Sequence, residues 1–275
     1  MPRDESRVVT PRGFAAAALP VTAHTVTTDA AGLDAGEVTV AVGDFAMPAY
    51  RAAPAGKTGL PVMLVVSEIF GVHEHIADVG RRFARLGYLA LAPELFVRQG
   101  DAKAHTDMGK LVSEVIGKVP DAQVMADLEA CVAWAHAHGG DTSRLGVTGF
   151  CWGGRIVWLY CAHSAAVKAG VAWYGRLVGE ATPLTPRHPV DIASALQAPV
   201  LGLYGAADAG IPPASVDRMK AALAAGSMSA RRSEFIVYPD APHAFHADYR
   251  ASYRKDAAHD GWARCVAWFK EHGVA

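Results

Sequence analysis

The sequence predicts an α/β protein with a mostly parallel central sheet, helices on both faces of that sheet, and an N-terminal antiparallel hairpin. Two observations favour this class. From residue 61 onward, short apolar runs typical of buried strands alternate with segments whose apolar residues repeat at helical spacing. Strands that alternate with helices form βαβ units, and such units build parallel sheets. Before residue 61, two alternating segments flank Gly43-Asp44 and predict the hairpin.

The expected strands are short and rich in branched apolar residues. The run from Pro61 to Ser67 (PVMLVVS) is apolar almost throughout, as expected of a strand that is buried on both faces. The hairpin strands are expected at 37–42 and 47–52, and further strands at 88–92, 144–150, 169–174, 199–204 and 233–238.

The expected helices are defined by their apolar spacing and by their ends. Gly87 is placed as the C-cap of a helix over 76–86, and Gly139-Gly140 closes an amphipathic helix over 121–138. Further helices are expected at 106–119, 154–163, 213–225 and 252–272, whereas the proline-rich stretch 175–197 is expected to be a loop.

Composition places the chain among globular proteins and argues against several functions. The 275 residues are 51% hydrophobic, which is ample for a buried core. Lys plus Arg (26) nearly balances Asp plus Glu (27), so nothing indicates nucleic acid or a membrane surface as partner. No stretch reaches the ~18 apolar residues needed to span a bilayer. We therefore expect a small-molecule partner and a monomer or homodimer.

The first 32 residues differ from the rest of the chain. Phe14 and the apolar run Ala15 to Leu19 resemble the start of a signal peptide, and Val21-Thr22-Ala23 resembles a cleavage site. The apolar run is shorter than a functional leader needs. We interpret residues 1–32 as an N-terminal extension, either an eroded leader or a plain flexible end, and residues 33–275 as one domain.

The four cysteines are Cys131, Cys151, Cys161 and Cys265, and none forms a C-x-x-C pair. Three of them lie in helical patterns, so they are interpreted as packing residues with reduced thiols. Reduced thiols favour a cytoplasmic location; the alternative is export, if the N-terminal leader is functional.

The stretch around Cys151 has the layout of a nucleophile elbow. A branched strand leads into a Gly-x-Cys-x-Gly motif, and a helical pattern follows. The turn from strand to helix is too tight for side chains at the flanking positions, which explains Gly149 and Gly153. The turn holds the sulfur above the sheet, at the positive end of the next helix, which stabilises a thiolate.

A cysteine nucleophile needs a base, and the base needs an orienting group. In α/β-hydrolases an acid and then a histidine follow the elbow along the chain. Asp208 follows one buried strand and His243 follows the next, and such a fold builds its site at the carboxyl ends of parallel strands. We therefore expect Asp208 to orient His243 as general base. The simpler interpretations are a turn residue and an ordinary loop histidine.

Five motifs stand in order along the chain, and together they resemble the dienelactone hydrolase family (carboxymethylenebutenolidases). That family consists of α/β-hydrolases with a Cys-His-Asp triad, and the resemblance runs from about Gly36 to the C-terminus. It implies an α/β-hydrolase fold and a hydrolase that opens lactone or ester bonds through an acyl-thioester. The motifs are Ser67-Glu68-Ile69-Phe70-Gly71, Pro93-Glu94-Leu95-Phe96-Val97-Arg98, Gly149-Phe150-Cys151-Trp152-Gly153-Gly154, Tyr204-Gly205-Ala206-Ala207-Asp208 and Pro242-His243-Ala244-Phe245.

The resemblance also implies roles for residues beside the triad of Cys151, Asp208 and His243. Glu68 would approach the resting thiol and take its proton when substrate arrives. A raised pKa, expected of a carboxylate at the end of a buried strand, would suit that role. The backbone N–H groups of Ile69 and Trp152 would form the oxyanion hole.

Substrate recognition is where this chain departs from the family, which binds its substrate's carboxylate with two arginines. Arg98 stands where the first is expected. The second normally lies four residues after the catalytic histidine, where this chain has Ala247, so His246 or Arg250 would have to replace it. Tyr174, at the end of a strand, is a further candidate for the pocket lining.

The other polar motifs predict neither a metal nor a cofactor. His73-Glu74-His75 does not place two histidines on one helix face, and no glycine-rich phosphate loop opens a helix. Two alternative functions stay open. A glutamine-amidotransferase-like protein also carries a cysteine on an elbow, but it does not need Asp208 next to His243. A non-catalytic binding protein with a hydrolase fold would leave Cys151 no more reactive than the other cysteines.

Overall fold

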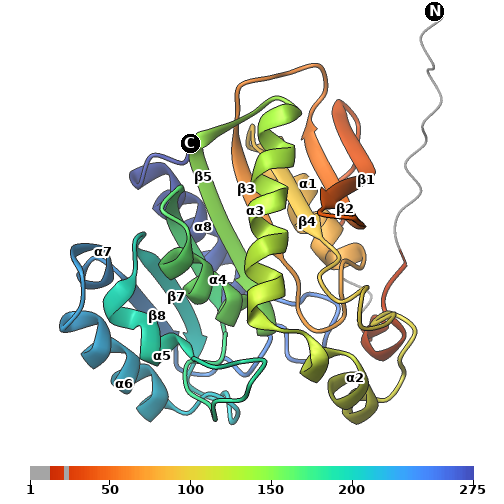
Figure 1. The fold of residues 1–275 in the computed structure, drawn as a ribbon. Helices are drawn as coiled ribbons and strands as arrows, with labels where there is room; N and C mark the ends of the chain where they lie inside the picture. The colour runs from red at the N-terminus through yellow and green to blue at the C-terminus, as the bar shows by residue number, and fades with distance from the viewer. Residues whose placement is uncertain (1–12, 22–24) are drawn as a thin grey trace, which may run out of the picture.

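The computed structural model describes residues 13–21 and 25–275, and at its centre is a single sheet (Figure 1). Within this part of the chain, eight strands lie in the order β1-β2-β4-β3-β5-β6-β7-β8. The strands are β1 (Leu33–Val42), β2 (Phe45–Pro54), β3 (Leu60–Val66), β4 (Leu89–Pro93), β5 (Gly140–Phe150), β6 (Val167–Trp173), β7 (Val200–Gly205) and β8 (Glu234–Tyr238).

The direction of the strands agrees with the prediction. β1 and β2 form the antiparallel hairpin, β2 pairs antiparallel with β4, and every pairing from β4 to β8 is parallel. The parallel part arises because each of its strands is linked to the next by a helical crossover. The carboxyl ends of β3, β5, β6, β7 and β8 therefore lie at one edge of the sheet.

Helices cover both faces of the sheet. In Figure 1, α3 and α4 lie in front of the sheet, whereas α1 and α8 lie behind it. The α-helices are α1 (Glu74–Arg85), α2 (Met108–Glu114), α3 (Asp121–Ala137), α4 (Trp152–His163), α5 (Pro189–Ile192), α6 (Pro213–Ala224), α7 (Met228–Arg231) and α8 (Lys255–Glu271). The described part of the chain also has short 3-10 helices, η1 (Ala16–Ala18), η2 (Ile116–Lys118) and η3 (Ala193–Ala195).

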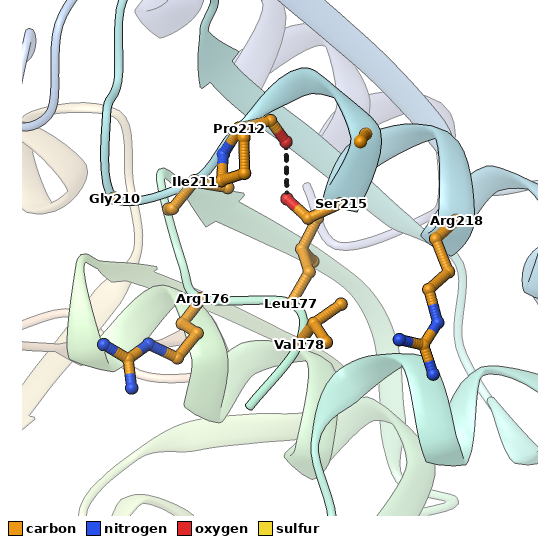
Figure 2. A pocket seen from close by; sticks show the side chains of 9 residues that line it. Arg176, Leu177, Val178, Gly210, Ile211, Pro212, Ser215 and Arg218 are labelled. Carbon is orange, nitrogen blue, oxygen red and sulfur yellow. Dashed lines mark hydrogen bonds between the residues drawn. The ribbon is translucent and has the colours of Figure 1, made fainter. Parts of the chain in front are cut away.

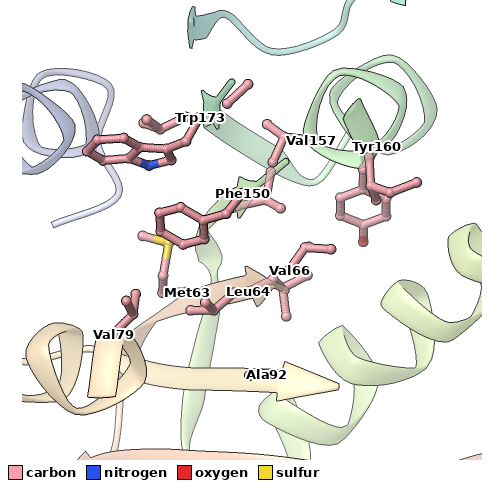
Figure 3. Close-up of a cluster of buried hydrophobic side chains, with 14 of the residues drawn as sticks. Met63, Leu64, Val66, Val79, Ala92, Phe150, Val157, Tyr160 and Trp173 are labelled. Carbon is pink, nitrogen blue, oxygen red and sulfur yellow. The ribbon is translucent and has the colours of Figure 1, made fainter. Parts of the chain in front are cut away.

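The core lies on both faces of the central strands. β3 is buried along almost its whole length, as its apolar run predicts. Because successive side chains of a strand point to opposite faces, Met63 lies on the side of Val79 from α1, and Val66 lies on the side of Val157 from α4 (Figure 3).

Several elements differ from the prediction, and most of them are short. The helix expected over 106–119 is divided into α2 and η2, and the loop expected over 175–197 contains α5 and η3. α7 was not predicted, because four residues are too few to show a helical period. β5 begins at Gly140 rather than at residue 144, because Leu60 and Pro61 of β3 already pair with Gly140 and Asp141.

The segment before β1, which the sequence separates as an extension over residues 1–32, has contacts with the rest of the chain where it is described. Ala15 and Ala18 are buried in the core, and the Ala16 N–H donates to the Lys103 carbonyl at 2.8 Å. The Thr28 N–H and carbonyl bind Asp78 and Arg81 of α1. The cleavage site suggested at Val21-Thr22-Ala23 lies largely outside the described residues.

Candidate active site

Cys151 occupies a strained turn between β5 and α4. Its backbone has φ 54° and ψ −113°, a conformation that costs free energy for any residue other than glycine. The flanking glycines are required by close backbone contacts. A Cβ on Gly149 would lie 2.4 Å from the Gly153 carbonyl oxygen, and a Cβ on Gly153 would lie 2.3 Å from the Val66 carbonyl oxygen. The geometry is that of a nucleophile elbow, as the sequence predicts.

Asp208 and His243 meet at the same edge of the sheet. The His243 Nδ1 lies 2.6 Å from the Asp208 Oδ2, although 35 residues separate them along the chain. Asp208 is buried, and its other oxygen accepts from the Gly210 N–H at 2.9 Å, so its orientation is fixed from both sides. His243 is more open to solvent than Asp208, because 38% of the His243 side chain is exposed.

The thiol of Cys151 lies within hydrogen-bonding reach of His243. Burial alone would lower the pKa of the imidazole, but its hydrogen bonds to Asp208 and Cys151, together with their negative charges, raise that pKa to about 10. The protonated imidazole of His243 is therefore favoured at neutral pH. Three side chains thus form a connected Cys-His-Asp arrangement.

Two backbone N–H groups, that of Trp152 directly after Cys151 and that of Ile69 after β3, are the candidates for an oxyanion hole. Trp152 is the first residue of α4, so its N–H has no acceptor within the helix. Ile69 lies in the turn after β3, and its N–H donates to no other residue in the described part of the chain. Either group remains available to a developing negative charge on a substrate oxygen.

Glu68 is held in a buried polar network, in which each of its carboxylate oxygens has a partner. Its Oε2 lies 3.1 Å from the His73 Nε2, and its Oε1 accepts from the Tyr249 hydroxyl at 3.2 Å. Burial would raise the pKa of Glu68, but the hydrogen bond and positive charge of His73, with a smaller contribution from His75, lower it to about 2. The raised pKa expected from the sequence is therefore wrong.

Tyr174 is fully buried and lines the space between the triad and Glu68. Its ring meets the His243 ring edge-on at a centroid distance of 5.2 Å. Its hydroxyl has no hydrogen-bond partner among the described residues. Burial raises the pKa of Tyr174 well above its ordinary value, and the charges of Glu68 and Cys151 raise it further. The pKa of Tyr174 therefore depends on the charges of both Glu68 and Cys151.

Two residues predicted to bind substrate have other partners. Both terminal nitrogens of Arg98 donate to the buried Asp127 of α3, at 2.7 and 2.8 Å, and the guanidinium stacks on Phe45. His246 is buried between Trp173 and Phe150, with ring centroids 4.5 and 5.1 Å away. Neither side chain joins the group around Cys151. The sequence could not show this, because a helical Asp127 has the same pattern whether it is paired or solvated.

Arg250, the other residue that could replace the second family arginine, lies near the turn that follows Glu68. Its Cζ stands 5.6 Å from the centre of the Phe70 ring, in the turn that follows Glu68. Burial raises the pKa of Tyr249, and the positive charge of Arg250 opposes that rise. The half-buried guanidinium donates no side-chain hydrogen bond to any residue that the structure describes. Among the described residues it is a cation near Phe70 and Tyr249 without an acidic partner.

A pocket of about 340 Å³ lies beside the Asp208 loop, between the chain that follows β6 and the start of α6 (Figure 2). Leu177, Ile211 and Pro212 form its apolar wall, and Arg176 and Arg218 stand at its two ends. Neither Cys151 nor His243 lines it. It is therefore a neighbour of the triad and not the space in which the thiol reacts.

A parallel sheet with helices on both faces, a nucleophile elbow after β5, and an acid and a histidine after β7 and β8 define an α/β-hydrolase. The model of the dienelactone hydrolase family matches residues 47–273. The chain belongs to the dienelactone hydrolase family, and it is accordingly a carboxylic ester hydrolase that acts on lactones or esters.

The relatives agree along almost the whole chain. A Methylorubrum extorquens protein, provisionally named a carboxymethylenebutenolidase, is 61% identical over 265 residues, which are 96% of this chain and 90% of the relative. A protein of Escherichia coli strain K12 with the same provisional name is 52% identical over 95% of this chain and 96% of its own. The crystal structure of a provisionally named dienelactone hydrolase from Klebsiella pneumoniae is 56% identical, with a TM-score of 0.84, covering 86% of this chain and 98% of the other.

The geometry weakens the first alternative left open by the sequence. A glutamine-amidotransferase-like protein would not need Asp208 beside His243, whereas these side chains are in contact. In the described part of the chain, no helix has the length and apolar character needed to cross a membrane.

Proposed function

We propose that this hydrolase uses Cys151 as nucleophile, His243 as acid and base, and Asp208 as the group that orients His243. The observation that carries the proposal is the contact chain from the Asp208 carboxylate through His243 to the thiol on its strained turn. The substrates are small esters or lactones, of which an enol-lactone is the best suited, because an enolate is a good leaving group for attack by a thiolate.

The reaction takes two steps. The Cys151 thiolate attacks the carbonyl carbon, and the N–H groups of Ile69 and Trp152 bind the oxyanion. The C–O bond to the leaving group breaks, and the leaving oxygen takes the proton of His243. Because the thioester carries no charge, the neutral His243 can then accept a proton from water. The resulting hydroxide attacks the thioester, and release of the acid restores the thiolate and the protonated imidazole.

The first prediction tests the nucleophile. Cys151→Ala should lower kcat for an activated p-nitrophenyl ester by about 10⁴-fold or more, because the covalent route is lost. Cys161→Ala is the matched control: Cys161 is a buried thiol in α4, ten residues further along the same helix, and its loss should leave kcat within about twofold. Activity near the wild-type rate in Cys151→Ala would remove the basis of the proposal.

In this proposal, Arg250 binds the carboxylate of the substrate. Arg98 is already bound by Asp127, and the position of the second family arginine is the buried Ala247. Arg250 supplies a guanidinium beside Phe70 and near the hydroxyl of Tyr249, and it has no acidic partner within residues 13–21 and 25–275. A guanidinium fork suits a carboxylate, and a half-buried position strengthens the interaction.

The second prediction compares two arginines. Arg250→Ala should raise KM about tenfold for an ester that carries a carboxylate, and should leave KM for its neutral methyl ester within twofold, because only the anion loses a charged hydrogen bond. Arg218→Ala, which removes an exposed arginine from the pocket of Figure 2, should change neither value. Equal effects of Arg250→Ala on both esters would assign Arg250 a structural role.

A further inference from the structure

A pocket of about 310 Å³, distinct from that of Figure 2, lies beside α1 and α8, the helices behind the sheet in Figure 1. Arg82 of α1, Trp262 of α8, and His246 and Tyr253 of the loop after β8 line it, and Val26 lines it from the segment before β1. None of the three triad residues is in its lining. Its volume is at the lower end of the range of small-molecule sites and is enough for a compound with a single ring.

His246 brings an unpaired polar group to this pocket. The residue is 3% exposed, and its Nδ1 has no hydrogen-bond partner among the described residues. Its ring is held between Phe150 and Trp173, so the imidazole cannot turn freely to find a partner. A buried polar side chain that forms no hydrogen bond is costly and uncommon in folded proteins. A molecule in the pocket that forms a hydrogen bond with the imidazole would recover that cost.

The charged groups in the wall of this pocket compensate one another. The Arg82 Nε donates to Asp78 at 2.6 Å, and its Nη2 donates to Asp248 at 3.1 Å. Asp248 also pairs with His75 at 3.0 Å and accepts from the Val26 N–H at 3.1 Å. The cation and the acids are thus already paired with each other, so the pocket offers little net charge to an ionic ligand.

The groups that face a ligand are flat and neutral. Burial lowers the pKa of His246 well below its ordinary value, and the charges of His75 and Arg82 lower it further, so the imidazole is uncharged at neutral pH. A neutral imidazole donates one hydrogen bond and accepts another. The Trp262 ring lies 6.1 Å from the His246 ring, with 29° between their planes, and its apolar surface suits an aromatic ring.

We propose that this pocket binds a small uncharged aromatic compound with a hydroxyl or carbonyl group, whose ring packs against Trp262 and whose polar group forms a hydrogen bond with His246. His246 stacks on Phe150, the residue before Cys151, so the bound compound would lie behind the nucleophile elbow without entering the space in which the thiol reacts. The compound is a second ligand of the protein and need not be its substrate.

The test measures the Kd of three single-ring probes by NMR titration. Phenol carries a neutral hydroxyl group, toluene carries a methyl group of similar size, and benzoate carries a negative charge. Phenol should bind with a Kd of about 1 mM or lower. Benzoate should bind at least about threefold more weakly than phenol, because its charge would be buried without a partner.

The decisive variant is His246→Phe, which retains a flat ring between Phe150 and Trp173 but removes the hydrogen bond. The Kd of phenol should rise about 3- to 10-fold, whereas the Kd of toluene should change less than about twofold. The comparison between the two probes separates the loss of a hydrogen bond from a general change in the shape of the pocket.

A second variant fills the pocket. Ala258 of α8 is 3% exposed and lines it, so Ala258→Leu should raise the Kd of both phenol and toluene by about tenfold or more. Ala263→Leu is the matched control, because it makes the same change at an exposed position of α8, and both Kd values should stay within about twofold. Thermal unfolding of each variant checks that it is folded.

Four results would overturn the proposal. Phenol that does not bind at about 20 mM would mean that the pocket takes no such ligand. Equal changes for phenol and toluene in His246→Phe would show that the imidazole forms no hydrogen bond with the probe. Unchanged binding in Ala258→Leu would place the probes elsewhere on the protein, and tighter binding of benzoate than of phenol would mean that charge is recognised.

These results do not depend on the proposed nucleophile. The titrations need no hydrolysis, and Cys151→Ala should bind phenol as the wild type does, because the thiol is outside the pocket. If His246→Phe does not fold, His246→Leu takes its place, with the same expected difference between phenol and toluene.

Discussion

The two sides of this active site hold their carboxylates in different ways. On the β7–β8 side, Asp208 binds one histidine, His243, whose side chain is 38% exposed and reaches the sulfur. On the β3 side, Glu68 also binds one histidine, but His73 is fully buried, and it contacts Tyr249 and Phe14 of the N-terminal segment 13–21, the strap. Each side is a carboxylate with a histidine, and only one of them faces substrate.

The difference shows that exposure, more than residue type, separates a proton-transfer pair from a charge-holding pair. A histidine that delivers protons must reach both the sulfur and water, and His243 does. A histidine that keeps a neighbouring carboxylate ionised acts best out of water, where the same charge has a larger effect, and His73 is placed in that way. Variants on the two sides should therefore produce different kinds of defect.

The largest effect is expected on the triad side. Asp208→Asn preserves the shape of the side chain but removes the charge that orients His243, so kcat should fall by about 10³–10⁴-fold. The same change removes a negative charge that raises the pKa of His243, so the basic limb of the activity profile should move to lower pH. Steady-state rates between pH 5 and pH 11 measure both effects.

Asp217→Asn is the control for this variant, because Asp217 is an exposed aspartate on α6. Its kcat should stay within about twofold of wild type. If Asp208→Asn lost no more than Asp217→Asn, then the 2.6 Å contact with His243 would have no part in catalysis, and the comparison between the two sides would fail.

The sequence predicts the triad side well and the Glu68 side poorly, and there is a physical reason. Cys151, Asp208 and His243 follow the strands β5, β7 and β8, and strand ends converge at one edge of a parallel sheet whatever the side chains do. The partners of Glu68 have no such constraint. Tyr249 lies 181 residues away in a loop, and its contact with Glu68 depends on the path of that loop.

The same reasoning applies to the fold. The long buried strands and amphipathic helices were predicted because their periods extend over many residues. The strap was predicted to be a leader or a flexible end, because a short run of alanines has the same composition whether it is buried or exported. Only the structure shows Ala15 and Ala18 in the core.

A further prediction concerns the free energy of unfolding at acidic pH, to which Glu68 contributes. The pKa of Glu68 is lowered from 4.5 to about 2 in the folded protein, so its contribution to stability is complete above pH 4.5 and is lost as the pH falls through about 2. That contribution is on the order of 2–3 kcal/mol by linkage. Glu68→Gln should therefore show a smaller fall in the free energy of unfolding between pH 5 and pH 2.5.

Urea unfolding at a series of pH values measures this difference. Glu271→Gln, which changes an exposed glutamate at the end of α8, should retain the wild-type dependence on pH. Asp248, whose pKa is also lowered to about 2, should keep part of the dependence in every variant that leaves it in place. Parallel curves for Glu68→Gln and the wild type would mean that His73 does not hold Glu68 as an ion.

The smallest effect is expected from the strap (residues 13–21), whose contacts with His73 and Tyr249 lie on the Glu68 side. Phe14→Ala removes a partly buried ring that contacts His73 and Tyr249, so the free energy of unfolding should fall by about 1–2 kcal/mol. Leu19→Ala, at a position that is 64% exposed, should change it by less than about 0.5 kcal/mol.

The same variant separates the two sides of the site. Water that enters beside His73 would weaken its interaction with Glu68, so the dependence of the free energy of unfolding on pH in Phe14→Ala should move toward that of Glu68→Gln. The His243–Asp208 pair has no contact with the strap, so kcat for a neutral activated ester should change less than threefold. A large loss of kcat with an unchanged acid dependence of stability would instead place the strap with the triad, against the division of roles argued above.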